Sequence, residues 1–206
     1  MTRLCRYAAL ATLVGCTPQG DPGIGARFSD SFERDKLGDH WERTHGAWAI
    51  EDGQVHARGA RNHPLWLKRR IPRDVRIEFD ARSDSADGDI KVEVFGDGVS
   101  FASTDRYVAS GYVIILGGWG NSRNVLARMD EHGADRIEGP PIRVEPRKTY
   151  RVRIEREGPR LSVFVDDALL LAMTDPDPLE GRGHDHFGFN NWQSDLWFDN
   201  LRITPL

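Results

Sequence analysis

The chain has 206 residues, of which 39% are hydrophobic and 29% charged, a balance ordinary for a globular protein with one all-β domain or two small domains. A net charge of −4 argues against a general nucleic-acid-binding protein, because neutralising phosphates requires an excess of basic residues. Cys5 and Cys16 both lie near the N-terminus, so we expect no disulfide framework, zinc cluster or catalytic thiol in the folded part.

The N-terminal segment has the pattern of an export signal. Arg3 and Arg6 precede a short apolar stretch at 7–14, which is too brief to span a bilayer as a stable helix. Residues 13–16, LVGC, resemble the bacterial lipobox. We therefore predict a lipoprotein signal peptide over 1–15, with an ordinary secretory signal and a chance cysteine as the alternative.

The lipobox resemblance implies that Cys16 carries a diacylglycerol and becomes the first residue of the mature protein. The absence of Asp at position 17 implies sorting to the outer membrane. Residues 16–26 contain Pro and Gly without a periodic apolar face, which is typical of a flexible tether. The protein is thus expected to be exported and anchored by lipid at the outer membrane, on its periplasmic or cell-surface side.

Short strands with frequent turns are predicted along 27–206. Apolar and polar residues alternate with a period of two, and no amphipathic helix longer than about two turns is evident. The predicted strands span 27–32, 47–51, 54–58, 65–71, 75–82, 89–95, 112–116, 125–129, 136–138, 142–144, 187–192 and 196–203, with three more between 150 and 173.

Two turn signals are strong. Asp52-Gly53 separates two alternating runs and predicts a tight hairpin. In the stretch 150–173, Gly158-Pro159 and Asp166-Asp167 separate three strands, which predicts a β-meander. A meander cannot bury its apolar face alone, so a second sheet must cover it. The predicted fold is an all-β, two-sheet antiparallel jelly-roll sandwich over 27–206.

Several segments resemble the concanavalin A-like lectin and glucanase jelly rolls, and most closely their laminin-G-like and 3-keto-disaccharide hydrolase-like branches. The segments are FSDSF at 28–32, Trp41, AWAIEDGQV at 47–55, LSVFVDD at 161–167 and LWFDNLRI at 196–203. These motifs are structural, so the resemblance predicts the fold more specifically than the function.

A glucanase would need two carboxyl groups on one strand face. In the family 16 glucanases they lie in the pattern E-x-D-x-x-E, and the nearest match here is Glu78, Asp80 and Ser83. Because Ser83 replaces the last carboxylate, we assign no catalytic residue and expect a solvated strand face.

Three segments combine tryptophan with amides, a composition suited to sugars, whose C–H faces stack on aromatic rings while amides bind the hydroxyls. They contribute the candidate carbohydrate-binding residues Trp119, Asn121, Asn191, Trp192 and Trp66. The alternative is that these tryptophans are core residues and the Asn-Gly clusters are turns.

A single calcium ion is a further expectation from the resemblance, because related jelly rolls often hold one through acidic residues near the first and last strands. Asp30 and Asp199 occupy such positions. His184 and His186 would share a strand face, but without a third ligand a loop is the simpler interpretation.

The sequence therefore favours a lipid-anchored envelope protein that binds a glycan or polysaccharide through a non-catalytic, lectin-like jelly roll. The alternatives are a hydrolase or lyase acting on keto-disaccharides and a protein-binding laminin-G-like module. A deep pocket with two carboxylates, or with a carboxylate and His184 or His186, would favour the enzyme, and a shallow aromatic groove the lectin.

Overall fold

The computed structural model describes residues 27–104 and 106–206. The predicted signal peptide over 1–15, the lipidated Cys16 and the tether to residue 26 lie outside the described residues. Within the described residues, no helix is long and apolar enough to cross a membrane.

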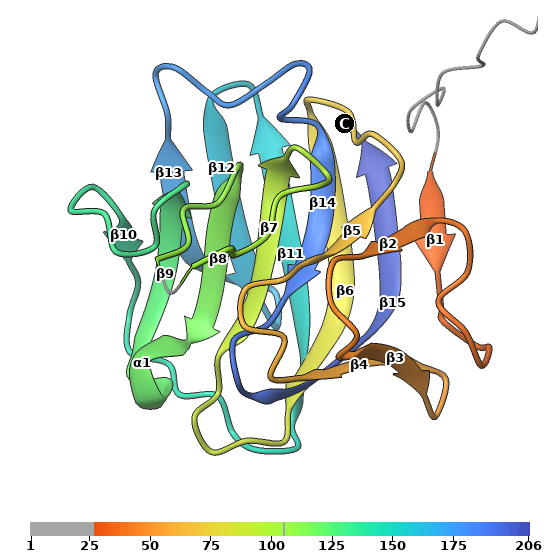
Figure 1. The fold of residues 1–206 in the computed structure, drawn as a ribbon. Helices are drawn as coiled ribbons and strands as arrows, with labels where there is room; N and C mark the ends of the chain where they lie inside the picture. Colours follow the sequence, from red (N-terminus) through yellow and green to blue (C-terminus); the bar gives the residue numbers. More distant parts are fainter. Residues whose placement is uncertain (1–26, 105) are drawn as a thin grey trace, which may run out of the picture.

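Two antiparallel sheets face each other across the core, which confirms the predicted jelly-roll sandwich (Figure 1). The eight-stranded sheet contains, in spatial order, β13 (Ala168–Thr174), β12 (Arg160–Val165), β11 (Thr149–Glu157), β6 (Val75–Ser83), β15 (Asp195–Pro205), β4 (Gln54–Arg58) and β3 (Trp48–Glu51), with β1 (Phe28–Asp30) also paired to β15. The seven-stranded sheet contains β10 (Ile137–Glu138), β9 (Arg123–Arg128), β8 (Tyr112–Gly117), β7 (Ile90–Gly96), β14 (His186–Asn190), β5 (Leu65–Leu67) and β2 (Trp41–Arg43).

The predicted hairpin and meander are both present. β3 pairs with β4 around Asp52 and Gly53, whose φ angles of 49° and 71° are those of a tight reversal. β11, β12 and β13 pair in sequence order, and the second turn again has two positive φ angles, 49° at Asp166 and 66° at Asp167. Local turn chemistry therefore sets the register of these strands.

The core between the sheets is centred on phenylalanines from both layers. Phe189 of β14 stacks on Phe198 of β15 at 4.4 Å between ring centroids, and Phe79 of β6 meets Phe189 edge to face at 5.6 Å. All three side chains are at most 2% exposed. Val152, Ile154, Leu161 and Val163 of the meander belong to the same core, so its apolar face is covered by the second sheet, as predicted.

A second, smaller apolar cluster lies on the outer face of the seven-stranded sheet. The segment 97–111, which we call the cover loop and whose Asp105 is not described, contributes Ala102, Tyr107 and Ala109. They pack on the outward residues of β8 and β9, which are Val113, Ile115, Val125 and Ala127. β8 is buried on both faces for this reason, and its sequence is accordingly an unbroken apolar run.

The predicted strand at 142–144 is wrong, because these residues have no regular secondary structure. The neighbouring strand is only two residues long, β10, at the edge of the seven-stranded sheet. Pro140 and Pro141 precede the segment and remove two backbone donors that a continued ladder would need.

Candidate functional site

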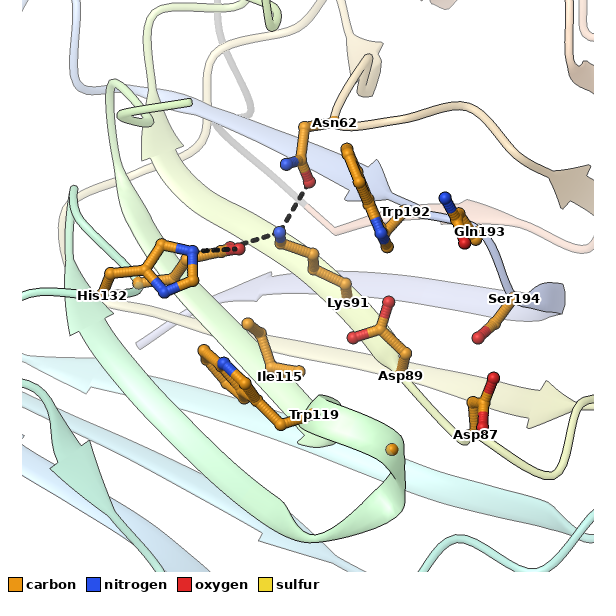
Figure 2. A pocket seen from close by; sticks show the side chains of 12 residues that line it. Asn62, Asp87, Asp89, Lys91, Ile115, Trp119, His132, Trp192, Gln193 and Ser194 are labelled. Carbon is orange, nitrogen blue, oxygen red and sulfur yellow. Dashed lines mark hydrogen bonds and ion pairs between the residues drawn. The ribbon is translucent and has the colours of Figure 1, made fainter. Parts of the chain in front are cut away.

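A cleft of about 430 Å³ opens on the outer side of the seven-stranded sheet, beside the cover loop (Figure 2). Its floor comes from β7 and β8, and its walls come from the turns that follow β6, β8, β9 and β14. The lining residues are Asn62, Asp87, Asp89, Lys91, Ile115, Trp119, Gly120, Glu131, His132, Trp192, Gln193 and Ser194.

Lys91 lies in the middle of the floor. Ile90, Val92 and Val94 of β7 point into the main core, so alternation directs Lys91 to the opposite face. Its side chain is only 2% exposed. The ammonium donates a hydrogen bond to Asn62 Oδ1 at 2.6 Å and forms an ion pair with Glu131 Oε2. A lysine buried to this degree is rare without such partners.

Asp89 stands beside Lys91 at the start of β7 (Figure 2). Its backbone is held by a 3.0 Å hydrogen bond from Asp89 N to Gly117 O. Burial raises the pKa of the Asp89 carboxyl to about 6, the positive charge of Lys91 opposes this rise, and Glu131 and Asp87 add to it. A carboxyl that titrates near neutral pH can accept a proton from a bound molecule.

Glu93 continues the outward row of β7 beyond Lys91 and is completely buried. Tyr107 of the cover loop donates its hydroxyl to Glu93 Oε2 at 3.1 Å, and Asn190 Nδ2 donates to Oε1 at 2.6 Å. Burial raises the pKa of Glu93 to about 7, although Lys91 and both hydrogen bonds act in the opposite direction. Glu93 thus exchanges its proton near neutral pH, next to the charged floor.

Trp119 forms one wall of the cleft and is 38% exposed. It sits in the short α1 (Gly118–Asn121) in a left-handed conformation, with φ 50° and ψ 58°. This backbone is rare for a bulky side chain and is characteristic of functional sites. The edge of His132 meets the indole at 5.6 Å, and the Arg136 guanidinium lies over the ring at 5.4 Å.

Trp192 forms the facing wall, in the turn after β14, and is half-buried. Trp192 O accepts a 2.9 Å hydrogen bond from Arg61 N, and the Arg61 guanidinium lies 5.7 Å from the centre of the indole. Neither Arg61 nor Arg136 lines the cleft. Both predicted tryptophans therefore belong to one cleft.

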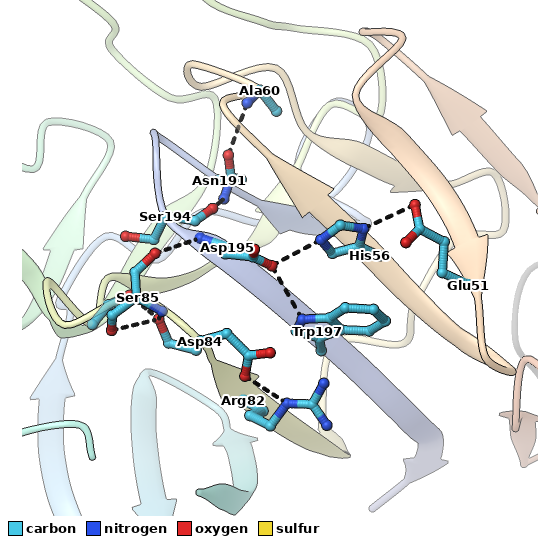
Figure 3. A network of polar contacts seen from close by, with 12 residues as sticks. Glu51, His56, Ala60, Arg82, Asp84, Ser85, Asn191, Ser194, Asp195 and Trp197 are labelled. Carbon is cyan, nitrogen blue, oxygen red and sulfur yellow. Dashed lines mark hydrogen bonds and ion pairs between the residues drawn. The ribbon is translucent and has the colours of Figure 1, made fainter. Parts of the chain in front are cut away.

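Asn121 and Asn191 are buried and hold these walls from behind. Asn121 Nδ2 donates to Val144 O at 2.7 Å and to Ala86 O at 3.0 Å, while Asn121 Oδ1 accepts from Val144 N at 2.8 Å. Asn191 Oδ1 accepts from Ala60 N, and its amide donates to Ser194 O (Figure 3). Both side chains fix backbone next to a tryptophan and neither lines the cleft.

Trp66 lies on the same outer face but under the cover loop, where it is 0% exposed. Its indole N–H donates to Ser100 O at 3.0 Å. The ring lies flat against Gly188 and Gly96, where an added Cβ would come within 2.7 Å and 2.4 Å of indole carbons. The structure therefore does not bring Trp66 to the surface of the cleft.

A polar network supports the turn that carries Trp192 (Figure 3). Asp195 N donates to Ser85 Oγ at 2.9 Å, and Asp195 Oδ1 lies 2.8 Å from His56 Nε2. His56 reaches Glu51 through its other nitrogen at 3.0 Å and stacks on Trp197 at 4.1 Å. These contacts tie the turn to β4 and β15.

The residues expected to bind calcium have other partners. Asp30 accepts two hydrogen bonds from the Arg34 guanidinium, at 2.6 and 2.8 Å, and one from the Trp41 indole at 2.9 Å. Asp199 accepts from Gln54 Nε2 at 3.2 Å. Both carboxylates therefore have protein partners, and the calcium expectation stays a prediction.

No group of three or more His, Cys, Asp or Glu side chains in 27–104 and 106–206 is arranged to hold a metal ion. His184 Nδ1 shares a 2.9 Å hydrogen bond with Ser110 O, and His186 Nδ1 lies 2.8 Å from Asp185 Oδ1. His184 thus contacts the end of the cover loop, whereas His186 lies against its neighbour Asp185.

The glucanase-like residues lie on the other sheet. Glu78 and Asp80 are half-exposed on the outer face of β6, in the eight-stranded sheet, and neither lines the cleft. Ser83 is fully buried and donates its hydroxyl to Gly88 O at 2.7 Å.

The charged floor was not predicted from the sequence. In I-K-V-E-V, Lys91 and Glu93 alternate with apolar residues, as the polar face of any half-exposed strand does. One signal was available: the following strand, β8, is apolar throughout, which indicates that the outer face next to β7 is covered.

Comparison with solved structures agrees with the fold. The carbohydrate-binding module CBM66 from Bacillus subtilis is 17% identical, with a TM-score of 0.60 over 82% of this chain and 98% of that chain. A Bacillus subtilis protein of unknown function with a galectin-like fold is 12% identical, with a TM-score of 0.64 over 87% and 96%. The carbohydrate recognition domain of Emp47p is 14% identical, with a TM-score of 0.58 over 87% and 95%.

At these identities the solved structures establish the fold alone. No curated protein sequence matches the chain. A family model, described as the 3-keto-alpha-glucoside-1,2-lyase-like domain, matches residues 28–204, which is nearly the whole described chain and includes every residue of the cleft. The chain therefore belongs to the 3-keto-α-glucoside-1,2-lyase-like domain family.

Proposed function

We propose that the cleft between Trp119 and Trp192 binds a carbohydrate. The observation that carries this proposal is that two partly exposed indoles, distant in sequence, line one cavity above a charged floor. Indole faces bind the C–H faces of sugar rings, and Gln193, Ser194 and Asp87 supply polar groups at the rim for hydroxyls.

Sugar binding can be tested with methyl glucosides, their 3-keto derivatives and polysaccharides cast in affinity gels. We expect Trp119→Ala and Trp192→Ala each to weaken binding at least ~10-fold, or about 1.4 kcal/mol, because each removes one wall. Phe164→Ala is the matched control, since Phe164 is also a half-buried aromatic residue but lies on β12, outside the cleft. Absence of binding to every sugar tested, or equal losses in all three variants, would contradict the proposal.

A second candidate function is catalysis of an elimination on a keto-glycoside, as the family description suggests. It is favoured by the carboxyl of Asp89, whose pKa of about 6 suits a general base. In a 3-keto-glycoside the proton on C2 is acidified by the adjacent carbonyl. Asp89 would remove this proton, the C1–O bond would break, and the departing oxygen would take up a proton.

This reaction is tested with p-nitrophenyl 3-keto-glucosides, from which elimination releases nitrophenol. Asp89→Asn is expected to lower the rate by about 10²- to 10⁴-fold, the usual contribution of a general base, while sugar binding persists. Asp80→Asn on the eight-stranded sheet is the control and should be silent. If the wild type binds sugar but releases no nitrophenol, the carbohydrate-binding function stands and the elimination activity is excluded.

We further propose that Cys16 anchors the protein by lipid at the outer membrane. Support comes from the LVGC motif after a short apolar stretch. Metabolic labelling with a fatty acid should mark the wild type and not Cys16→Ser, and membrane fractionation should follow the label. A wild type that is processed but carries no label would indicate an ordinary secretory signal.

A further inference from the structure

Lys91 is chemically distinct among the basic residues of the protein. The chain has only four lysines, at positions 36, 68, 91 and 148, among 28 lysines and arginines. Lys36 is exposed, and the side chains of Lys68 and Lys148 are 48% and 46% exposed. Lys91, at 2%, is the buried one, and it lies in the cleft.

Arginine would serve better if only a fixed positive charge were needed at this position, because its planar fork pairs two acceptors at once and remains charged. A lysine amine offers something that a guanidinium cannot, which is nucleophilic attack on a carbonyl carbon once a proton has been lost. Lys91 lines the cleft between the two indoles, so its amine lies next to the space in which a ligand would bind.

Glu131 is positioned to receive the proton that Lys91 must lose. Its Oε2 atom contacts Lys91 Nζ directly, and it has no hydrogen-bond donor other than this ion-pair partner. Asn62 Oδ1 holds the same nitrogen from another direction, at 2.6 Å. Figure 2 shows the Lys91 ammonium next to Asn62, with the Asp89 carboxylate and both indoles around it.

We propose that Lys91 Nζ forms a covalent imine with the ketone of a keto-sugar bound in the cleft. This inference rests on the second function proposed above, in which the ligand carries a carbonyl group. It makes Lys91 a catalytic residue in addition to Asp89.

The steps balance without an oxidant or a reductant. Glu131 takes one proton from the ammonium, the nitrogen lone pair attacks the carbonyl carbon, and transfer of a proton from nitrogen to oxygen gives a carbinolamine. Glu131 returns its proton to the hydroxyl, which leaves as water, and the protonated imine remains. Its positive nitrogen acidifies the neighbouring C–H more strongly than the ketone does, so that Asp89 can remove that proton and the electrons left behind form an enamine.

The test is reductive trapping of the imine in the full-length protein. Methyl 3-keto-α-glucoside is incubated with the protein, sodium borohydride is added, and intact mass and peptide mapping follow. We expect a single adduct equal to the sugar minus one oxygen atom, on the peptide that contains Lys91. The three exposed lysines serve as internal controls and should remain unmodified.

Two variants separate a covalent role from an electrostatic one. Lys91→Arg keeps the charge but cannot form an imine, so we expect complete loss of the adduct and at least ~100-fold slower elimination, with sugar affinity within about threefold of the wild type. Glu131→Gln keeps Lys91 and should slow the formation of the adduct.

Failure of the inference is distinguishable from failure of the proposed function. If the wild type releases nitrophenol but yields no adduct on Lys91, or if Lys91→Arg keeps most of the activity, the covalent role is overturned while the elimination stands. If the wild type neither binds nor converts the keto-sugar, the proposed function fails and the imine fails with it.

Discussion

The outer faces of β6 and β7 share a sequence pattern but differ in how deeply their charged side chains are buried. On β6, Glu78 and Asp80 alternate with core residues and remain half-exposed. On β7, Lys91 and Glu93 alternate with core residues in the same way and are almost completely buried. The cover loop and the turns around the cleft are packed against one sheet and not the other, so tertiary packing decides what an alternating charge can do.

Carboxyl groups on the two faces show the consequence. Glu155 lies on β11, next to β6. Partial burial acts to raise its pKa, but hydrogen bonds from Arg153 and Arg76 outweigh it and lower the pKa below the usual value. Glu93 on the covered face has its pKa raised to about 7 by burial. One face carries permanently charged groups and the other carries groups that exchange protons near neutral pH.

The largest difference in stability between variants on the two faces is expected from tryptophan substitutions. Trp66→Ala removes a fully buried indole from beneath the cover loop and should cost about 4 to 5 kcal/mol of unfolding free energy. Trp197→Ala on the eight-stranded sheet removes a half-buried ring and should cost less than half as much. Urea unfolding of both variants measures the difference, and equal losses would show that the cover loop does not seal its face.

Removal of a charged side chain should give the next largest difference in stability between the two faces. Lys91→Met leaves Glu131 buried without its partner and should cost about 3 to 4 kcal/mol. Arg76→Met breaks the 2.7 Å ion pair with Glu155, in which Arg76 is 43% exposed, and should cost less than about 1 kcal/mol. The same unfolding assay tests both, and a double variant with Glu131→Gln should recover part of the loss at Lys91.

The pH dependence of the unfolding free energy should reveal the raised pKa of Glu93. Because its folded pKa of about 7 exceeds the ordinary value of 4.5, its stabilising contribution is complete below pH 4.5 and is lost as the pH rises toward 7. The full loss corresponds to about 3 kcal/mol. Glu93→Gln mimics the protonated acid, so the variant should become the more stable protein as the pH rises through this window.

The unfolding free energies of the wild type and Glu93→Gln are measured at a series of pH values. Their difference isolates the contribution of Glu93, because the contributions that both proteins share cancel. Glu155→Gln on the open face should show the opposite sign, since a lowered pKa gives stability that is lost on acidification. A flat difference for Glu93 would mean that its carboxyl titrates normally.

A smaller loss of stability than at Trp66, Lys91 or Glu93 is expected behind the Trp192 wall, where it is coupled to binding. Asn191→Ala leaves Ala60 N without its partner and should cost about 1 to 2 kcal/mol. Sugar affinity should also fall, although Asn191 does not line the cleft, because the turn with Trp192 loses its support. Gln54→Ala on the eight-stranded sheet should change neither the unfolding free energy nor the sugar affinity. Isothermal titration calorimetry measures the sugar affinity of both variants.

Most of the fold could be predicted from the sequence, because the signals are local. Asp52-Gly53 and Asp166-Asp167 specify their turns, and period-two alternation identifies the strands of the meander. The failure at 142–144 followed from weighting apolar residues above the two preceding prolines. The pairing order within the seven-stranded sheet depends on contacts between distant segments, and no local pattern encodes it.

The site could be predicted only in part. Tryptophan next to glycine and asparagine directed attention to Trp119 and Trp192, which line one cleft, and their binding of a sugar stays a prediction. The same composition gave no means of separating a side chain that meets a ligand from one that supports a turn, as Asn121 and Asn191 do. Asp89 and Lys91 lie together at the start of β7, whereas Glu131 follows β9, so sequence spacing could not join the two segments that the sheet brings together.

The backbone at Trp119 has a consequence for the protein's evolution. Its neighbours Gly117, Gly120 and Asn121 suit a left-handed turn, whereas an indole at φ 50° costs about 1 to 2 kcal/mol. Random libraries selected only for heat resistance are therefore expected to recover glycine or asparagine at position 119. Libraries selected for sugar capture should retain the aromatic ring and accept the lower melting temperature.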